Sequence, residues 1–417
     1  MSEQPVLGIV VGGGPAPGIN GVIAAATLEA CNNNFRVVGI LDGFQHLMEG
    51  KTDQIVELDR RTIENIHIRG GSFLRTSRAN PTKNPEHMKN VVTALKSLGV
   101  RYLVTIGGDD TAFSSRSVHD SAGGAITVAH VPKTIDNDLP LPAGVPTFGY
   151  QTARDVGTRL VNNLMVDART TTRWYLVVAM GRTAGHLTLG IGKGAGVSLA
   201  LIPEEFGDRP VTFDEVCDIC HGTIIKSMAR GFGHGVMVLA EGLTEKMSTD
   251  HLEQLFGDSI ARDEHGHITL ADIELGSMVR KELRRRFKAN GQKLTMVSKN
   301  IGYELRCADP TPFDSEYTRD LGFGAVDFLV KGGSGAMIVY DGNQLHAKPF
   351  QELVDPSTGK TPVRLVDCSA QNYEIARRFM VRLEPEDSDP AKLAELAKAA
   401  GCSVEELQQQ LGHLMAG

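Results

Sequence analysis

Two acidic loops lie close together in the chain, and both hold residue types that suit phosphate chemistry. Residues 107–111 read GGDDT and residues 132–138 read PKTIDND, with about one helix and one strand between them. That spacing allows both loops to meet at one edge of a parallel sheet. Glycines let a backbone approach phosphate oxygens, carboxylates can hold a divalent cation or remove a proton, and Lys133 can meet transferred negative charge. Phosphoryl transfer uses all of these groups together.

A glycine-rich turn near the N-terminus is a third candidate for phosphate binding. Residues 12–20 read GGGPAPGIN and follow a short apolar run from Leu7 to Val11. Exposed backbone amides and the dipole of the following helix favour an anion at such a turn. The spacing does not meet the G-x-G-x-x-G pattern of dinucleotide-binding turns, so a purely structural turn stays open as an alternative.

Strand and helix patterns alternate along most of the chain, which predicts βαβ crossovers and mainly parallel sheets. The fold class expected is therefore α/β, with two Rossmann-like three-layer domains. Predicted strands in the first half are residues 7–11, 36–41, 102–106 and 125–131, and predicted helices there are 18–33, 85–98 and 111–120. In the second half the predicted strands are 174–179, 197–202, 236–240 and 336–340, and the predicted helices are 150–168, 273–288, 322–330 and the tail after 390.

Length and composition limit the classes of protein to which the chain can belong. A chain of 417 residues is longer than a single hydrophobic core usually supports, which favours two domains. The formal net charge of -7 argues against a nucleic-acid partner, because the summed field would repel a phosphate backbone. The N-terminus fits no targeting peptide and no apolar run reaches the length of a membrane span, so we expect a cytoplasmic protein without a membrane partner.

The six cysteines are scattered apart from one pair. Cys217 and Cys220, followed by His221, match the haem-attachment and redox-dithiol spacings. They fall inside a predicted helix, and haem attachment would require export. We therefore interpret them as helical core and surface cysteines.

Six motifs stand in the order typical of the phosphofructokinase family, which the chain resembles from about residue 6 to about residue 340. They are residues 13–20, 107–111, 132–138, 180–182, 240–242 and 302–306. The resemblance implies phosphorylation of fructose 6-phosphate at its 1-hydroxyl, a step of glycolysis, with the active site in the cleft between two domains. The expected phosphate-donor domain is residues 1–149 plus about 306–365, and the expected sugar-phosphate domain is residues 150–305 plus about 366–417.

Two positions bear on the phosphate donor. In the ATP-using branch of the family, glycine stands where this chain has Asp110 and again where it has Lys133. A carboxylate about 4 Å from an α-phosphate charge would cost about 4 kcal/mol at an effective dielectric constant of about 20, besides the steric overlap. Pyrophosphate ends where that carboxylate begins, and Lys133 can stabilise its charge as the bond to the transferred group loosens. The pattern resembles the pyrophosphate-dependent branch, and we expect a reversible reaction because pyrophosphate is a donor of moderate potential.

The matched motifs imply a role for each site residue. Asp136 is the expected general base that takes the proton of the attacking sugar hydroxyl, and Lys133 and Thr134 are the other catalytic residues. Asp109 is expected to hold Mg²⁺, the implied cofactor. The expected donor-binding residues are Gly14, Arg78, Asp110 and Lys133. The expected sugar-phosphate-binding residues are Thr134, Asp136, Asp138, Arg173, Met180, Gly181, Arg182, Glu241, Tyr303 and Arg306.

The resemblance also carries expectations about assembly and control. Arg173 matches a position that reaches the 6-phosphate held by a neighbouring subunit, which implies a homodimer or a higher homo-oligomer. The bacterial ATP enzymes of the family bind nucleotide effectors with an acidic residue where His186 stands here, so we expect no such control. The basic run Arg284-Arg285-Arg286 is expected to be a solvated helix face.

Three rival functions remain open at this point. The nearest is an ATP-dependent member of the same family. A NAD- or lipid-phosphorylating kinase could share the Gly-Gly-Asp loop, but it would not need Glu241 or the pair Tyr303 and Arg306. An oxidoreductase is the weakest alternative, because no acidic residue follows a true G-x-G-x-x-G turn at a suitable distance.

Overall fold

The computed structural model describes residues 4–142, 144–248, 273–341, 344–353, 357 and 361–416. It divides into two compact units. Unit 1 consists of Met1–Ala153 and Tyr303–Arg364, and unit 2 consists of Arg154–Gly302 and Leu365–Gly417. The sequence analysis expected the chain to cross between domains after residues 149, 305 and about 365, whereas the units in the structure change after Ala153, Gly302 and Arg364. The assignment of the donor to one unit and the sugar phosphate to the other stays a prediction.

Unit 1 is built on an eight-stranded sheet that is parallel except at its two edges. All six residues of the central strand β1 are buried, as expected for a parallel strand covered on both faces. The antiparallel edge strands and a two-residue strand, β6 (Phe148–Gly149), were not predicted. In spatial order the strands are β12 (Gln344–Pro349), β11 (Ala336–Asp341), β5 (Thr127–Thr134), β4 (Val100–Gly107), β1 (Val6–Val11), β2 (Arg36–Ile40) and β3 (Ile55–Leu58), and β6 pairs with β5.

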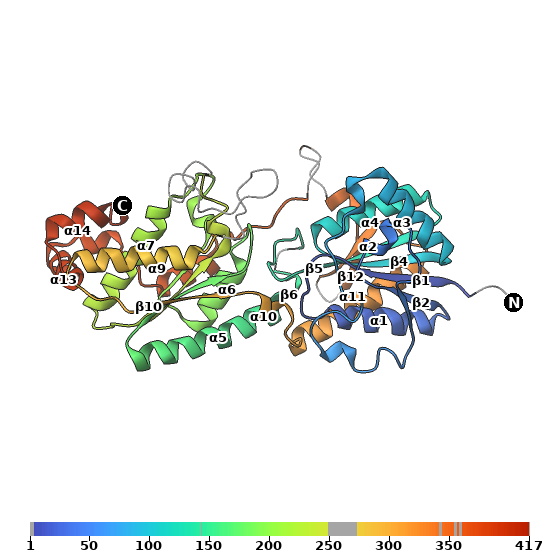
Figure 1. Ribbon diagram of the computed structural model, residues 1–417, viewed down its shortest axis with the longest axis horizontal. Coiled ribbons are helices and arrows are strands. Elements are labelled where there is room, and N and C mark those ends of the chain that lie inside the picture. The colour runs from blue at the N-terminus through green and yellow to red at the C-terminus, as the bar shows by residue number, and fades with distance from the viewer. Residues whose placement is uncertain are drawn as a thin grey trace. The chain divides into compact units, whose positions relative to one another are not determined.

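Helices cover both faces of the unit 1 sheet (Figure 1). On one face α1 and α11 pack side by side, and Gly322 allows their close approach because a Cβ there would lie 2.6 Å from the carbonyl oxygen of Val22. The prediction began α11 at residue 322, ten residues after its start in the structure. Helix α11 begins with Pro312, and proline is favoured at the first helical position. The helices of unit 1 are α1 (Ile19–Asn32), α2 (Gln45–Met48), α3 (Pro85–Ser97), α4 (Asp109–Ala122), α10 (Tyr303–Arg306) and α11 (Pro312–Val330), with short 3-10 turns η1 (Ile66–Ile68), η2 (Pro81–Lys83) and η7 (Phe350–Leu353).

Unit 2 has a smaller, fully parallel sheet of four strands. Figure 1 shows α7 and α9 on one face and α5 on the other, while α6 packs against β8. Trp174, Leu176 and Leu239 lie in the core between this sheet and α7. The strands are, in order, β10 (Met296–Ile301), β7 (Trp174–Ala179), β9 (Gly235–Ala240) and β8 (Leu199–Leu201). The helices are α5 (Tyr150–Thr171), α6 (His186–Ala195), α7 (Phe213–Ala229) and α9 (Leu275–Ala289), with 3-10 turns η3 (Pro203–Phe206) and η4 (Glu241–Leu243).

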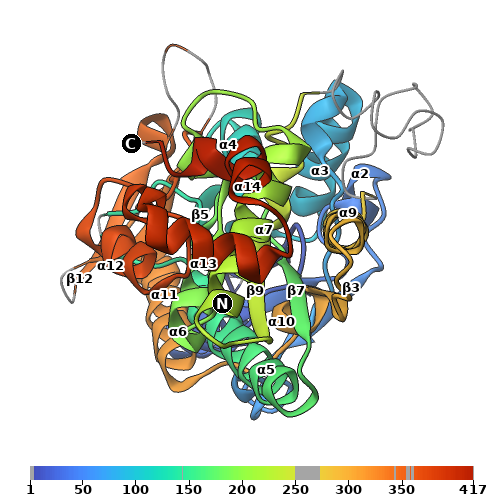
Figure 2. The same ribbon diagram turned by 90° about the vertical axis from the view of Figure 1, so that its left-hand side faces the viewer.

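The C-terminal segment completes the core of unit 2. Figure 2 shows α13 and α14 beside α7, in line with their packing contacts. Two buried ion pairs fasten the segment, Arg382 with Glu205 at 2.6 Å and Lys226 with Asp387. The elements are α12 (Gln371–Phe379), η8 (Pro385–Ser388), α13 (Pro390–Ala400), α14 (Val404–Leu411) and η9 (Gly412–Leu414).

Ser403 and Glu406 form a capping box at the start of α14. Cys217 and Cys220 are fully buried on α7, as expected for core cysteines. Among the described helices, we find none that combines the length and the apolarity needed to cross a membrane.

Candidate active site

The carboxyl ends of β1, β4 and β5 lie side by side in unit 1. Val11 pairs with Ile106 of β4, and Gly107 pairs with Pro132 of β5. The glycine-rich turn, the GGDDT loop and the PKTIDND loop therefore leave the sheet at the same edge, which confirms the expectation drawn from their spacing. Loops at the carboxyl ends of parallel strands are the usual ligand-binding position in α/β sheets.

A neighbouring segment fixes the glycine-rich turn through two hydrogen bonds. The amide of Gly13 donates to the carbonyl of Ser77 at 2.8 Å, and the hydroxyl of Thr76 donates to the carbonyl of Gly13 at 2.6 Å. Gly13 has a positive φ of 81°, which favours glycine. Arg78, which is exposed, directly follows this contact, so the structure places the predicted donor residues Gly14 and Arg78 on adjacent segments.

Lys133 reaches from β5 to the same turn. Its side chain is only 5% exposed, and its Nζ donates to the carbonyl of Gly14. If residue 13 carried a side chain, its Cβ would lie 3.3 Å from this Nζ. Burial lowers the pKa of Lys133 to about 8, while the charge of Asp136 acts in the opposite direction. The side chain is thus a buried cation that contacts the glycine-rich turn.

Asp109 and Asp110 form the first turn of α4 and do not precede it. The prediction began this helix at Thr111, which is two residues late. The N-terminal end of a helix dipole favours carboxylates, and this accounts for the longer helix. Burial, with the charges of Asp138 and Asp110, raises the pKa of Asp109 to about 7.

The surroundings of Asp109 fit a hard cation. Its Oδ1 atom is buried and has no hydrogen-bond partner, and a second carboxylate, Asp138, is close enough to perturb it. Unpaired carboxylate oxygens of this kind are the ligands that Mg²⁺ prefers. Within the described residues no cluster of three or more His, Cys, Asp or Glu side chains is arranged to hold a metal. Such a site suits an ion held jointly by one or two carboxylates and by substrate phosphates.

Internal hydrogen bonds shape the loop that carries Asp136. The amide of Asp136 donates to the hydroxyl of Thr134 at 3.0 Å, and the hydroxyl of Thr147 donates to the carbonyl of Thr134 at 2.7 Å. Asn137 has a positive φ of 58°, and its Oδ1 accepts the amide of Thr147 at 3.0 Å. The predicted base therefore sits in a tightly turned loop whose shape depends on Asn137.

Tyr303 and Arg306 belong to unit 1, on the short helix α10. The Arg306 guanidinium lies over the Tyr303 ring, 4.6 Å from its centroid, and its Nη1 would lie 2.9 Å from a Cβ at Gly14. The charge of Arg306 also contributes to the lowered pKa of Lys133. The structure thus brings this predicted sugar-phosphate residue to the glycine-rich turn, beside the predicted donor residues.

One buried network behind the GGDDT loop was missed by sequence reasoning. His130 of β5 is fully buried, and burial lowers its pKa to about 3, so the ring is neutral. Its Nε2 lies 3.1 Å from the carbonyl oxygen of Gly107, and its Nδ1 lies 2.9 Å from the hydroxyl of Thr105, which Ser115 approaches at 2.6 Å. The carbonyl can only accept, so Nε2 carries the proton. A single histidine in an apolar strand offers no sequence signal for this role.

Four of the predicted sugar-phosphate residues meet in unit 2. Met180, Gly181 and Arg182 follow β7, and Glu241 follows β9, its parallel neighbour. The amide of Gly181 donates to Glu241 Oε2 at 3.3 Å. A Cβ at Gly242 would overlap the carbonyl of Arg182, so the two segments approach closely. Arg182 is exposed and Glu241 is half-buried.

Arg173 lies apart from these residues. It directly precedes β7, whereas Met180 directly follows it, so the two residues lie at opposite ends of the strand. Its Nε lies 3.8 Å from Asp167 and has no hydrogen-bond partner. A residue at this end cannot join Met180 and Glu241 around one sugar phosphate within unit 2.

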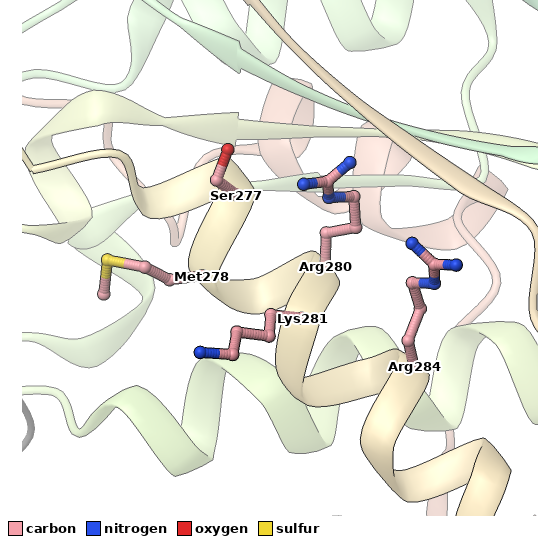
Figure 3. Close-up of a pocket in the computed structure, with 5 residues that line it drawn as sticks. All are labelled: Ser277, Met278, Arg280, Lys281 and Arg284. Atoms are coloured by element: carbon pink, nitrogen blue, oxygen red, sulfur yellow. The ribbon is translucent and has the colours of Figure 1, made fainter.

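The basic run on α9 divides into two groups. Arg286 pairs with Asp218, Asp214 and Glu282, and Arg285 pairs with Glu282. Arg284 instead lies beside a surface pocket of about 400 Å³. Figure 3 shows the side chains that line it, and none belongs to the predicted site; they are Ser277, Met278, Arg280, Lys281 and Arg284.

Comparisons with known proteins show the family to which the chain belongs. A pyrophosphate--fructose 6-phosphate 1-phosphotransferase from Naegleria fowleri is 53% identical, covering 99% of this chain and 96% of that protein. A protein of the same name from Thermotoga maritima is 51% identical and covers 99% of both chains. The solved structure of a pyrophosphate-dependent phosphofructokinase from Marinobacter aquaeolei shares the fold, with a TM-score of 0.64 over 99% of this chain and 92% of that chain at 17% identity. The model of the family Phosphofructokinase (PFK) matches residues 6–329, and the chain belongs to that family.

Proposed function

We propose that this chain transfers a phosphoryl group from pyrophosphate to the 1-hydroxyl of fructose 6-phosphate, giving fructose 1,6-bisphosphate and phosphate. The observation that carries the proposal is the buried Lys133 ammonium against the glycine-rich turn. Two full-length relatives that are more than half identical bear the name of this activity. The reaction is reversible, because the pyrophosphate bond is of moderate potential.

Space and charge support pyrophosphate over ATP. Lys133 fills volume beside Gly13 and donates to the carbonyl of Gly14, and a glycine at position 133 would leave that volume open. Asp110 adds an exposed carboxylate on the first turn of α4. An α-phosphate about 4 Å from that carboxylate would be opposed by about 4 kcal/mol at an effective dielectric constant of about 20. A donor with only two phosphates avoids this position.

The chemical step assigns one task to each residue. Asp136 takes the proton of the sugar 1-hydroxyl as its oxygen attacks the phosphorus, and the bond to the leaving phosphate breaks. Lys133 offsets the negative charge on the donor, and Thr134 and Arg78 help to orient it. Asp109, assisted by Asp138, would hold Mg²⁺, which neutralises charge on the phosphoryl group when bound.

The sugar phosphate is assigned to the remaining predicted residues. Glu241 accepts a hydrogen bond from a sugar hydroxyl, and Met180, Gly181 and Arg182 line the same strand ends. Tyr303 and Arg306 add the aromatic face and the guanidinium that can fork onto the 6-phosphate.

We also propose that the chain assembles as a homodimer or larger homo-oligomer. The proposal is supported by the position of Arg173 at the far end of β7 from Met180, which suits an arginine that serves a second copy of the chain. Sedimentation at several protein concentrations tests it. Full activity in a monomer would overturn it.

Donor preference of the purified protein tests the function directly. With fructose 6-phosphate and Mg²⁺, we expect turnover with pyrophosphate and little with ATP. Robust turnover with ATP and none with pyrophosphate would favour the ATP-dependent alternative. Phosphorylation of NAD or a lipid without sugar turnover would place the chain with a different substrate.

A further inference from the structure

Arg364, at the end of unit 1, contacts the loop that carries Asp136. Its backbone amide donates to the carbonyl of Asp138 at 2.7 Å. Its guanidinium donates through Nε to the carbonyl of Asn137 at 3.0 Å, through Nη1 to the carbonyl of Val145 at 2.8 Å, and through Nη2 to Asn137 Oδ1. One arginine therefore joins both arms of the loop, 227 residues away in the chain.

The contacts centre on the one residue between the two aspartates of the loop. Asn137 lies between Asp136 and Asp138 and adopts a left-handed conformation with a φ of 58°. Asparagine tolerates this region better than most non-glycine residues, and hydrogen bonds to its side chain help to hold it there. Asn137 Oδ1 accepts from Arg364 and also from the amide of Thr147. The planar guanidinium suits this fork, which a lysine ammonium cannot reproduce.

We propose that Arg364 is a positioning residue for phosphoryl transfer, acting through Asn137 to fix the backbone that carries Asp136. The inference rests on the proposed function, in which Asp136 is the base. Arg364 lies beyond residues 6–329, the part of the chain that the family model matches. Proton removal needs the base within hydrogen-bonding reach of the hydroxyl, and a displacement of about 1 Å can cost about 100-fold in rate.

A purely structural role is the alternative. Arg364 is the last residue of unit 1 before the chain enters unit 2, so its contacts could simply fasten this crossing. In that case its loss would lower the melting temperature and leave the turnover of the folded enzyme unchanged. A positioning role requires a fall in kcat with the KM values for both substrates little changed.

The test compares Arg364→Lys and Arg364→Ala with wild type in the pyrophosphate assay, together with melting temperatures. Arg377→Ala is the matched control, because Arg377 forms a half-exposed pair with Glu384 in unit 2. For both Arg364 variants we expect kcat to fall by roughly 10- to 100-fold, with KM changed by less than about threefold. Added guanidinium ion, below denaturing concentrations, should restore part of the kcat of Arg364→Ala and should not affect Arg377→Ala.

A double-mutant cycle with Asn137→Gly identifies the route. Glycine keeps the left-handed backbone and removes the Oδ1 acceptor. Arg364→Lys should therefore cost less in the Asn137→Gly background than in wild type. Wild-type kcat in Arg364→Lys, or equal costs in both backgrounds, would overturn the proposal. If Arg364→Ala does not fold, Arg364→Lys and the cycle decide the question. Absence of wild-type turnover with pyrophosphate would instead reject the proposed function.

Discussion

The charged side chains at the strand ends of the two units differ in how deeply they are buried. In unit 1, Lys133 is buried and Asp109 has a carboxylate oxygen without a partner, and burial shifts the pKa values of both groups toward neutrality. In unit 2, Arg182 is exposed, and Glu241 accepts a backbone amide at 3.3 Å. Perturbed pKa values are typical of groups that take part in chemistry. The difference supports the proposal that unit 1 carries the chemical step, while Met180, Arg182 and Glu241 of unit 2 help to bind the sugar phosphate.

The largest expected effect is at the base. Asp136→Asn keeps the shape of the side chain and removes its ability to take a proton. We expect kcat to fall by roughly 10²- to 10⁴-fold, the usual contribution of general base catalysis, with sugar-phosphate affinity retained. Steady-state kinetics and calorimetric titration of fructose 6-phosphate measure the two quantities. Turnover near that of wild type would remove Asp136 from the mechanism.

Glu241→Gln makes the matching change in unit 2. The amide oxygen can still accept from Gly181, but a charged hydrogen bond to the sugar is lost. Such bonds contribute about 1.5–3 kcal/mol, so the KM for fructose 6-phosphate should rise by roughly 10- to 100-fold with little change in kcat. Glu245→Gln, two residues after the 3-10 turn that carries Glu241, is the control for loss of charge. A fall in kcat without a rise in KM would break the proposed division between the units.

The alkaline limb of the pH profile should report Lys133. Because burial lowers its pKa to about 8, the ammonium is charged below that pH and loses its proton above it. The kcat/KM for pyrophosphate should therefore fall by about tenfold per pH unit above pH 8. A bound anion favours the charged form, so the limb in kcat should lie at higher pH. A flat kcat/KM profile up to pH 10 would show that the charge of Lys133 is not used.

The position of the two acidic loops could be predicted from the sequence. The order of apolar strands and polar loops placed residues 107–111 and 132–138 at one sheet edge, because parallel strands end on the same side. The edge strand β12 escaped prediction, since four of its six residues are exposed and it contains a histidine, a lysine and a proline. The start of α4 at Asp109 was missed because the two carboxylates resemble a turn.

Long-range polar contacts could not be predicted at all. Arg364 meets Asn137 across 227 residues, and His130 meets Gly107 through a ring nitrogen whose partner is a backbone carbonyl. Neither contact leaves a periodic pattern or a motif, because each depends on where the completed fold brings a backbone oxygen. The same holds for Arg306, which the structure places beside Gly14.

Exchanging Asp110 and Lys133 for glycine tests most directly whether these side chains select the donor. Removing a charge penalty of about 4 kcal/mol corresponds to about three orders of magnitude. We predict that Asp110→Gly with Lys133→Gly raises kcat/KM for ATP by up to that factor and sharply lowers kcat/KM for pyrophosphate, in protein that melts as cooperatively as wild type. A folded double variant that uses ATP no better than wild type would contradict the account.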